Sequence, residues 1–266
     1  MNRHITWLVF VLLVAVCFAG GPQLLETADA QFIINPYRHG GVVAPTDYVH
    51  YWNPASLDET DQVGSRDADS HDFNADATYG WNIGTVVQRY IRLNGVIANG
   101  RNYTITMWLR PHLADIATNA YGGFVMCERL STPGTKSDYE LTCHAAGVYQ
   151  MRVYNSVGSY VIDSQTAGTT YTWQHLAAVV NDDDNTLQVF VNGESDGSTA
   201  MTITPNDAYV GGGLYNRTTL GTWSWTTPGD GRVKYEGQIG KVRFYKRCLS
   251  LAEIQAEILA DGETGP

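Results

Sequence analysis

The segment from Tyr235 to Ile258 constrains the fold of this 266-residue chain more than any other stretch. It predicts one strand followed directly by one short helix. Ser250 is placed to cap the helix, and Glu253 lies three residues later, which completes a capping box. Gly262 is the predicted end of the helix, because glycine readily adopts the left-handed conformation found there. Any fold for this chain must therefore accommodate a strand joined tightly to a helix.

The strand in this segment could include a bulge at Gly240. Val242 and Phe244 share one face of a regular strand, because side chains alternate between faces. Ile239 lies three residues before Val242, so it can share that face only if the strand bulges at the glycine that follows it. Arg243 and Tyr245 are expected on the opposite face. In the helix, an apolar stripe is expected from Leu251, Ile254 and Ile258.

Much of the remaining sequence predicts short strands separated by turns, which is typical of a two-sheet sandwich. Residues 58–82 are expected to form a loop. The composition is rich in the Thr, Ser, Asn, Gly and Tyr that strands and turns need. The expected strands cover residues 90–97, 103–109, 148–153, 159–163, 173–180, 187–191 and 208–210, with a further hairpin around Cys127.

Three stretches in chain order resemble the signature of a known family. They are TITMWLRP at 104–111, WQHLAAVVNDDDNTLQVFVNG at 173–193, and the final strand and helix with Val-Arg-aromatic-Tyr, Leu-Ser and Ala-Glu-Ile. Together they resemble laminin-G-like domains of the concanavalin A-like lectin/glucanase family. The resemblance implies an all-β fold, a two-sheet antiparallel jelly-roll sandwich with one short C-terminal helix. It implies little about activity, because one fold hosts many functions.

The net charge of the chain limits the classes of partner that it can bind. The formal net charge is -10, from 17 Lys and Arg against 27 Asp and Glu. Such an acidic chain is a poor match for nucleic acid or an anionic membrane surface. We therefore expect neither as a partner.

The N-terminus has the pattern of a signal peptide. A short basic start, an apolar run and Ala28-Asp29-Ala30 predict cleavage after residue 30, with an uncleaved membrane anchor as the alternative. The expected organisation is a signal peptide at 1–30, an extended arm at 31–48 and the sandwich domain at 49–266. The mature chain is expected to be secreted, extracellular or at the cell surface, with no membrane span. The arm is either a first edge strand or a segment that joins a neighbouring subunit by strand addition, giving a homo-oligomer.

Three cysteines would remain after cleavage. Cys127 and Cys143 flank the turn sequence STPGTKS, and the midpoint between them is residue 135. If their segments form a hairpin, the two thiols lie nearly opposite and close enough for a disulfide. The alternative is two buried thiols. Cys248 has no evident partner.

Catalytic machinery is not evident in the sequence. Glycosidases need two carboxylates, and no Glu-x-Asp-x-Glu or near variant occurs on an expected strand. His175 is interpreted as a packed, hydrogen-bonded core histidine. No Gly-x-Ser-x-Gly nucleophile motif is present. The sequence therefore favours a protein that is not an enzyme, and a glycoside hydrolase of this fold is the least favoured function.

Two acidic segments are candidates for Ca²⁺, which prefers oxygen ligands. Asp67, Asp69 and Asp72 place three carboxylates in one expected loop, and proteins related to laminin-G-like domains often bind calcium at a loop edge. The segment is not an EF-hand, because it lacks the central Gly and the closing Glu. Asp182, Asp183 and Asp184 form a second candidate, although Asp residues also simply favour turns.

A loop near the C-terminus is the candidate for binding a sugar. Trp223 and Trp225 project to the same side if that piece is extended. Tyr215 and Asn216 lie in the same Gly- and Thr-rich stretch. These four residues form the candidate glycan-binding site, the alternative being that the tryptophans cap the end of the sandwich.

Two functions of different classes follow. The first is an exported, non-catalytic module that binds a carbohydrate or cell-surface ligand, with Ca²⁺ as a candidate cofactor. The second is a structural subunit of an extracellular fibre or coat, assembled through residues 31–48.

Overall fold

The structure is a computed structural model of the whole chain and divides into two units, residues 1–41 and 42–266. It describes part of the second unit. The described residues are 42–53, 62–63, 68–71, 75–76, 80–83, 90–94, 102–114, 116, 123–129, 139–154, 159–201, 217–221 and 235–262.

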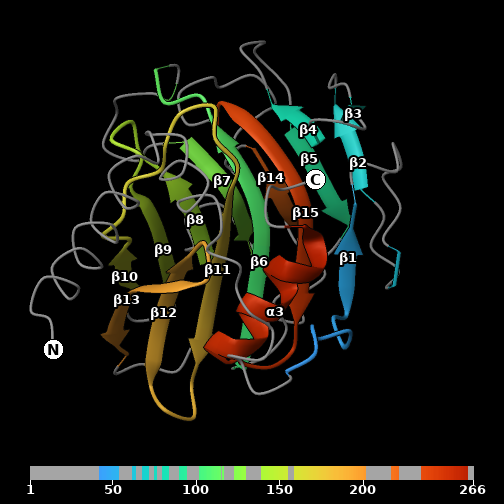
Figure 1. The fold of residues 1–266 in the computed structure, drawn as a ribbon. Helices are drawn as coiled ribbons and strands as arrows, with labels where there is room; N and C mark the ends of the chain where they lie inside the picture. The colour runs from blue at the N-terminus through green and yellow to red at the C-terminus, as the bar shows by residue number, and fades with distance from the viewer. Residues whose placement is uncertain are drawn as a thin grey trace, which may run out of the picture. The chain divides into compact units, whose positions relative to one another are not determined.

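The described strands form two antiparallel sheets, one of eight strands and one of seven (Figure 1). The predicted sandwich with one short C-terminal helix is confirmed. The eight-stranded sheet has the order β13 (Glu194–Ala200), β12 (Thr186–Val191), β11 (Gln174–Asn181), β6 (Asn102–Pro111), β15 (Gly237–Tyr245), β4 (Gly80–Ile83) and β3 (Ala75–Asp76), and β1 (His50–Trp52) also pairs with β15. The seven-stranded sheet has the order β10 (Ser159–Asp163), β9 (Tyr149–Tyr154), β8 (Tyr139–Cys143), β7 (Gly123–Arg129), β14 (Arg217–Leu220), β5 (Tyr90–Asn94) and β2 (Ala68–His71).

Six of these strands were not expected from the sequence. β1 follows the predicted arm, β14 lies in the Gly- and Thr-rich stretch that was interpreted as a loop, and β2, β3 and most of β4 lie in residues 58–82, which were also expected to form a loop. For β2, β3 and β4 there is a reason in the sequence. Their short, polar or Gly-containing sequences lack a run of alternating apolar residues. β13 has the polar sequence ESDGSTA and lies at the edge of its sheet, where one face does not need to be apolar. β13 pairs with β12 across the Asn192-Gly193 turn, and β3 pairs with β4, so these partners are close in sequence, whereas β4 also pairs with β15, far along the chain.

The core between the sheets comes from alternate residues of the central strands. β6 contributes Tyr103, Ile105, Met107 and Leu109, and β15 contributes Ile239, Val242 and Phe244, each at most 3% exposed. Burying each such side chain stabilises the fold by roughly 1.5–3 kcal/mol. The predicted bulge in β15 is confirmed: Ile239 pairs with Leu109 and Val242 pairs with Met107, so the register shifts between them.

The outer face of the eight-stranded sheet is covered by α3 (Leu251–Asp261), which lies across β6, β11 and β15 in Figure 1. A second apolar cluster forms under it and includes Trp108, Phe190, Leu249, Ile254 and Ile258. The predicted capping box is present, and Gly262 ends the helix with φ 92°. The prediction that Leu251 belongs to the apolar stripe of the helix is wrong, because this side chain is 40% exposed.

The segment before β1 packs on its own domain. Asp47 forms a bidentate ion pair with Arg247, at 2.6 and 2.9 Å, and the ring of Tyr48 lies 5.9 Å from that of Tyr245. The last residues of the predicted arm at 31–48 are therefore docked on the sandwich, while residues 31–41 lie outside the described residues. None of the helices in the described part of the chain has the length and apolarity that crossing a membrane requires.

Candidate functional site

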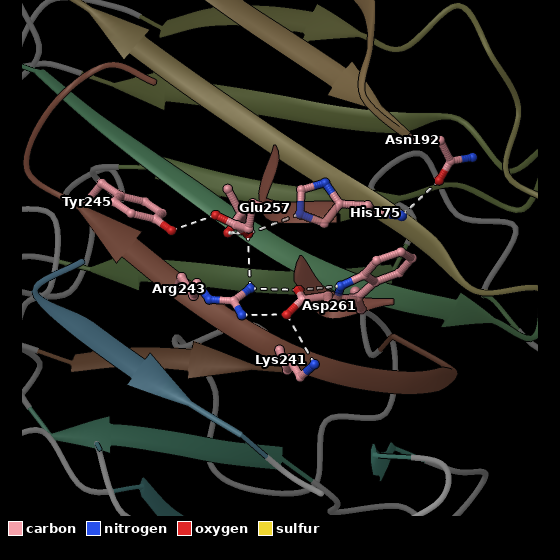
Figure 2. Close-up of polar contacts among 9 residues, drawn as sticks. His175, Asn192, Lys241, Arg243, Tyr245, Glu257 and Asp261 are labelled. Atoms are coloured by element: carbon pink, nitrogen blue, oxygen red, sulfur yellow. Dashed lines mark hydrogen bonds and ion pairs between the residues drawn. The ribbon is translucent and has the colours of Figure 1, made fainter. Parts of the chain in front are cut away.

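A buried group of polar side chains joins α3 to the outer face of the eight-stranded sheet (Figure 2). Arg243 on β15 donates to Glu257 Oε1 at 3.0 Å and to Asp261 Oδ1 at 2.6 Å. Tyr245 OH donates to Glu257 Oε2 at 2.5 Å, and His175 Nε2 lies 3.2 Å from Glu257 Oε1. The group draws on β15 and α3, which are neighbours in the chain, and on β11, which is distant from both in sequence.

The charges in this group stabilise one another. Burial alone raises the pKa of Asp261, but hydrogen bonds from Arg243 and its positive charge outweigh this and lower the pKa to about 2. Burial likewise opposes the ionisation of Glu257, yet His175 and Arg243 hold its pKa below the ordinary value. Burial works against the charge of Arg243 too, and the two carboxylates raise its pKa nevertheless. All three side chains are therefore charged in the folded protein.

This group has no access for a substrate. The side chains of Glu257, Asp261 and Arg243 are 2%, 3% and 9% exposed, and His175 is fully buried. Removing one member of such a buried pair leaves an uncompensated charge, and the pairs here connect α3 to β15. The prediction that His175 is a hydrogen-bonded core residue is confirmed, and the group serves to hold α3 on the sheet.

An exposed aromatic pair lies where β6 ends at Pro111 and β11 is about to begin. Tyr171 is 56% exposed, and its ring centroid lies 4.6 Å from that of the half-buried His112, with the planes tilted by 52°. We call His112 and Tyr171 the aromatic edge. Tyr171 is among the large hydrophobic side chains that the described residues leave exposed, and its contact with the ring of His112 makes it a candidate for contact with a ligand.

The loop that carries Tyr171 is fixed by hydrogen bonds on both sides. Tyr171 N–H donates to Pro111 O at 2.8 Å, and Arg110 Nε donates to Tyr171 O at 2.9 Å. Further along the loop, Gln174 Oε1 accepts from Tyr149 OH at 2.9 Å and from Thr169 N–H at 3.2 Å. The position of Tyr171 is therefore set by the sheets below it.

The segment with the two candidate tryptophans is attached at this same end of the sandwich. Residues 222–234, which include Trp223 and Trp225, lie outside the described residues, but the residues on either side are described. Tyr235 N–H donates to Gly221 O at 2.9 Å, and His112 N–H donates to Glu236 O at 2.9 Å. The segment thus leaves and returns next to the aromatic edge.

A second polar surface lies on the outer face of the seven-stranded sheet. Gln150, Arg152 and Tyr154 alternate with core residues along β9. Tyr154 OH donates to Glu140 Oε2 at 2.8 Å, Arg152 Nη2 donates to Gln150 Oε1 at 3.0 Å, and Gln150 Nε2 donates to Asp163 Oδ1 at 2.7 Å. Because these side chains bind one another, they offer fewer groups to a ligand than the aromatic edge does.

Most of the predicted site residues lie outside the described residues. These are the four glycan candidates Tyr215, Asn216, Trp223 and Trp225, and the calcium candidates Asp67 and Asp72. Asp69 is part of β2, at the register position opposite Arg92.

The second acidic segment is described, and its residues serve the turn. Asn102 Nδ2 donates to Asp183 Oδ2 at 2.6 Å, and Asn181 Nδ2 donates to Asp184 Oδ2 at 2.8 Å. Across the described residues, no group of three or more His, Cys, Asp or Glu side chains is arranged to hold a metal ion. The reading of Asp182–Asp184 as turn residues accounts for these contacts.

The predicted Cys127–Cys143 disulfide is not formed. β7 and β8 pair as expected, but Cys127 is opposite Glu140 and Cys143 is opposite Gly123. Three residues along β8 separate Glu140 from Cys143, which is about 10 Å in a strand and too far for a disulfide. Cys143 is free and buried, and burial raises the pKa of its thiol to about 12. The midpoint of the Cys127–Glu140 pair lies between residues 133 and 134, whereas the sequence argument required residue 135.

The aromatic edge was missed in the sequence. The signal available was a tyrosine in the Gly- and Thr-rich run AGTTYTW, the same kind of signal that singled out Trp223 and Trp225. Its partner His112 is distant along the chain, so only the pairing of β6 with β11 brings the two rings together.

The sequence from residue 84 to 255, more than half of the chain, matches the profile of the concanavalin A-like lectin/glucanases superfamily. The chain belongs to this superfamily. The resemblance to laminin-G-like domains seen in the three sequence stretches is thereby confirmed. A search of curated protein sequences returns no match.

Solved structures show how widely this superfamily fold is used. Domain 4 of the extracellular arabinanase AbnA from Geobacillus stearothermophilus, solved with arabinotriose, is 17% identical, with a TM-score of 0.57 over 79% of this chain and 97% of that domain. The receptor-binding domain of botulinum neurotoxin type G is 12% identical, with a TM-score of 0.58 over 81% of this chain and 52% of that one. The sialidase of Trypanosoma rangeli is 16% identical, with a TM-score of 0.57 over 85% of this chain and 35% of that one. At these identities the likeness concerns the fold.

Proposed function

We propose that this chain is an exported, non-catalytic module that binds carbohydrate at the end of the sandwich bearing His112 and Tyr171. The observation that carries the proposal is the exposed aromatic edge on a loop that hydrogen bonds hold in place. An aromatic face can stack on the apolar side of a sugar ring, and a fixed loop lowers the entropy lost on binding.

The proposal assigns the two predicted tryptophans to this location. Trp223 and Trp225 follow Gly221 closely in sequence, and Tyr235 returns the chain to the same place. If the two tryptophans extend from these attachment points, their rings add to the surface that Tyr171 begins. Tyr215 and Asn216 directly precede the first residue of β14, at the opposite end of that strand from Gly221, so the site proposed here takes the two tryptophans and not these two residues.

The relatives are compatible with binding more than with catalysis. The arabinanase domain was solved with arabinotriose, and the neurotoxin domain binds a receptor. The sialidase is an enzyme, and this chain matches only 35% of it. In the described residues, Glu257 and Asp261 lie near one arginine, but they are sealed under α3 and cannot act as a glycosidase pair.

Calcium remains part of the proposal through Asp67, Asp69 and Asp72. Carboxylates two and three residues apart can supply several oxygen ligands to one Ca²⁺. The alternative function, assembly through residues 31–48, has less support, because Asp47 and Tyr48 pack on their own domain.

The proposal is tested by a glycan array probed with the mature chain, residues 31–266, with and without a calcium chelator. We expect binding to one class of sugar and loss of that binding in the W223A/W225A double variant. Val43→Ser is the control, since Val43 is 80% exposed and precedes β1, which pairs with the far half of β15. A wild-type chain that binds no sugar would contradict the function, and binding unaffected by the chelator would contradict the role of calcium.

A further inference from the structure

Tyr171 has a backbone conformation that tyrosine rarely adopts. Its φ is 60°, and the other two non-glycine residues with positive φ in the described part of the chain are Asn185 and Asn192. Asparagine tolerates the left-handed region, whereas a bulky residue there costs roughly 1–2 kcal/mol. A strained conformation persists when the surrounding structure imposes it, and such residues cluster at sites that bind or catalyse.

The tyrosine side chain is not what holds the loop. The two hydrogen bonds that fix this position use the main-chain N–H and carbonyl of Tyr171, with Pro111 and Arg110 as partners. Thr172 N–H closes the turn on Thr169 O at 3.2 Å. Asparagine or glycine at this position would keep these bonds and relieve the strain. The ring itself is 56% exposed and touches His112 at its side.

The permanent charges beside Tyr171, those of Arg110 and Glu236, are occupied or buried. Arg110 donates from Nε to Tyr171 O and from Nη1 to Gln238 Oε1, at 2.9 and 2.6 Å. Glu236 is 2% exposed. In the described part of this edge, neither side chain is placed to pair with a charge on a ligand. An uncharged ligand with an apolar face therefore suits the site better than a sulfated or sialylated one.

We propose that the ring of Tyr171 is the stacking platform of the binding site, and that its ligand is an uncharged sugar ring. This inference rests on the proposed function and makes it more specific. The strained backbone presents the ring at the end of the sandwich, where a residue chosen for stability alone would be asparagine or glycine. Stability and binding thus make opposite demands on this position.

The test measures both quantities on the same variants of the mature chain. Y171N removes the ring and suits the backbone, so we expect its thermal midpoint to be unchanged or higher by roughly 2–4 °C. We expect its affinity for the best neutral oligosaccharide of the array to fall at least about tenfold, a loss of about 1.4 kcal/mol. Y171F keeps the ring and is expected to bind within about threefold of the wild type, a difference of under 1 kcal/mol.

Three results would overturn the inference. Y171N could bind as tightly as the wild type. Y171N could lose thermal stability, which would give the ring a structural role. The array's tightest ligand could be a charged glycan whose binding weakens steeply as salt rises to about 0.5 M. A wild-type chain that binds no sugar would overturn the proposed function as well. Binding by the wild type and equally by Y171N would overturn only the role of Tyr171.

Discussion

Glu257 accepts hydrogen bonds or ion pairs from four side chains although its carboxylate is only 2% exposed. The partners are Thr106, His175, Arg243 and Tyr245. A buried carboxylate is tolerated when it is paired and hydrogen-bonded, and removing its charge leaves the partners unsatisfied. The same residue therefore links three strands to α3.

Replacing Glu257 by Gln is expected to lower the free energy of unfolding by roughly 3–5 kcal/mol, because a buried pair with Arg243 is broken. Urea denaturation of the purified variant measures this change. Glu194→Gln is the matched control: Glu194 is exposed and should change stability by less than about 0.5 kcal/mol. A loss below about 1 kcal/mol in Glu257→Gln would show that the group contributes little.

At the scale of the element, the stability of α3 depends on the contacts made at its two ends. Ser250 and Glu253 satisfy its first backbone N–H groups, with Ser250 N–H donating to Glu253 Oε2 at 2.8 Å. Asp261 lies at the opposite end, where a negative charge opposes the helix dipole. Its position is favourable only because Arg243, Lys241 and Trp108 contact its carboxylate.

Ser250→Ala is expected to lower the free energy of unfolding by about 1 kcal/mol, since it removes the cap from the helix. Chemical denaturation with circular dichroism at the helix band measures the effect. Leu251→Ala is the control, because Leu251 is 40% exposed and should shift stability by no more than about 0.5 kcal/mol. Equal effects of the two changes would count against the capping box.

The pKa of Asp261 predicts a loss of stability in acid. The folded-state pKa is about 2, below the ordinary 3.8, so the carboxylate stabilises the folded chain above about pH 4. This contribution, about 2 kcal/mol, is lost as the pH falls from about 4 to about 2. Asp261→Asn should flatten the fall in that window, measured as unfolding free energy at several pH values. An unchanged profile in the variant would contradict this assignment.

At the scale of the whole sandwich, β1 joins the N-terminal side of the domain to its C-terminal strand. His50 to Trp52 pair with Val242 to Phe244, and Trp52 is fully buried. β4 pairs with the other half of β15, at Gly237 to Ile239. The same edge of β15 is thus shared by two segments that are far from it in sequence.

Truncation separates the contribution of β1 from that of the residues before it. A chain of residues 42–266 should keep the thermal midpoint of residues 31–266, because the docked contacts are retained. A chain of residues 54–266 loses the burial of Trp52, worth about 2–3 kcal/mol, and should melt roughly 5–10 °C lower. Calorimetry measures the midpoints. Light scattering on the first two chains also tests the arm, since a smaller particle after removal of residues 31–41 would favour assembly through it.

β15 and α3 show how much of this fold could be predicted from the sequence. The bulge after Ile239, the cap at Ser250 and the end at Gly262 depend on residues close to one another, so local pattern was sufficient. The strands β2, β3 and β4 were not predicted, because their sequences carry no strong periodicity, and β4 pairs with β15 far away in the chain. β13 was missed although the Asn192-Gly193 turn that joins it to β12 is a local hairpin signal, because its own sequence is polar. The prediction of a Cys127–Cys143 disulfide was wrong for a related reason. The register of a long hairpin depends on its turn and on any bulge in its strands.

The sequence by itself determined the all-β class, the superfamily and the strand–helix unit at the C-terminus, because these follow from periodicity, capping residues and short motifs. Only the tertiary structure decided which polar residues meet. Arg243, Glu257 and His175 form one buried group, and His112 and Tyr171 one exposed edge, through pairing between distant strands. Contacts between residues far apart in the chain are set by sheet register and by the packing of the helix on the sheet, and neither is encoded in a local stretch of residues.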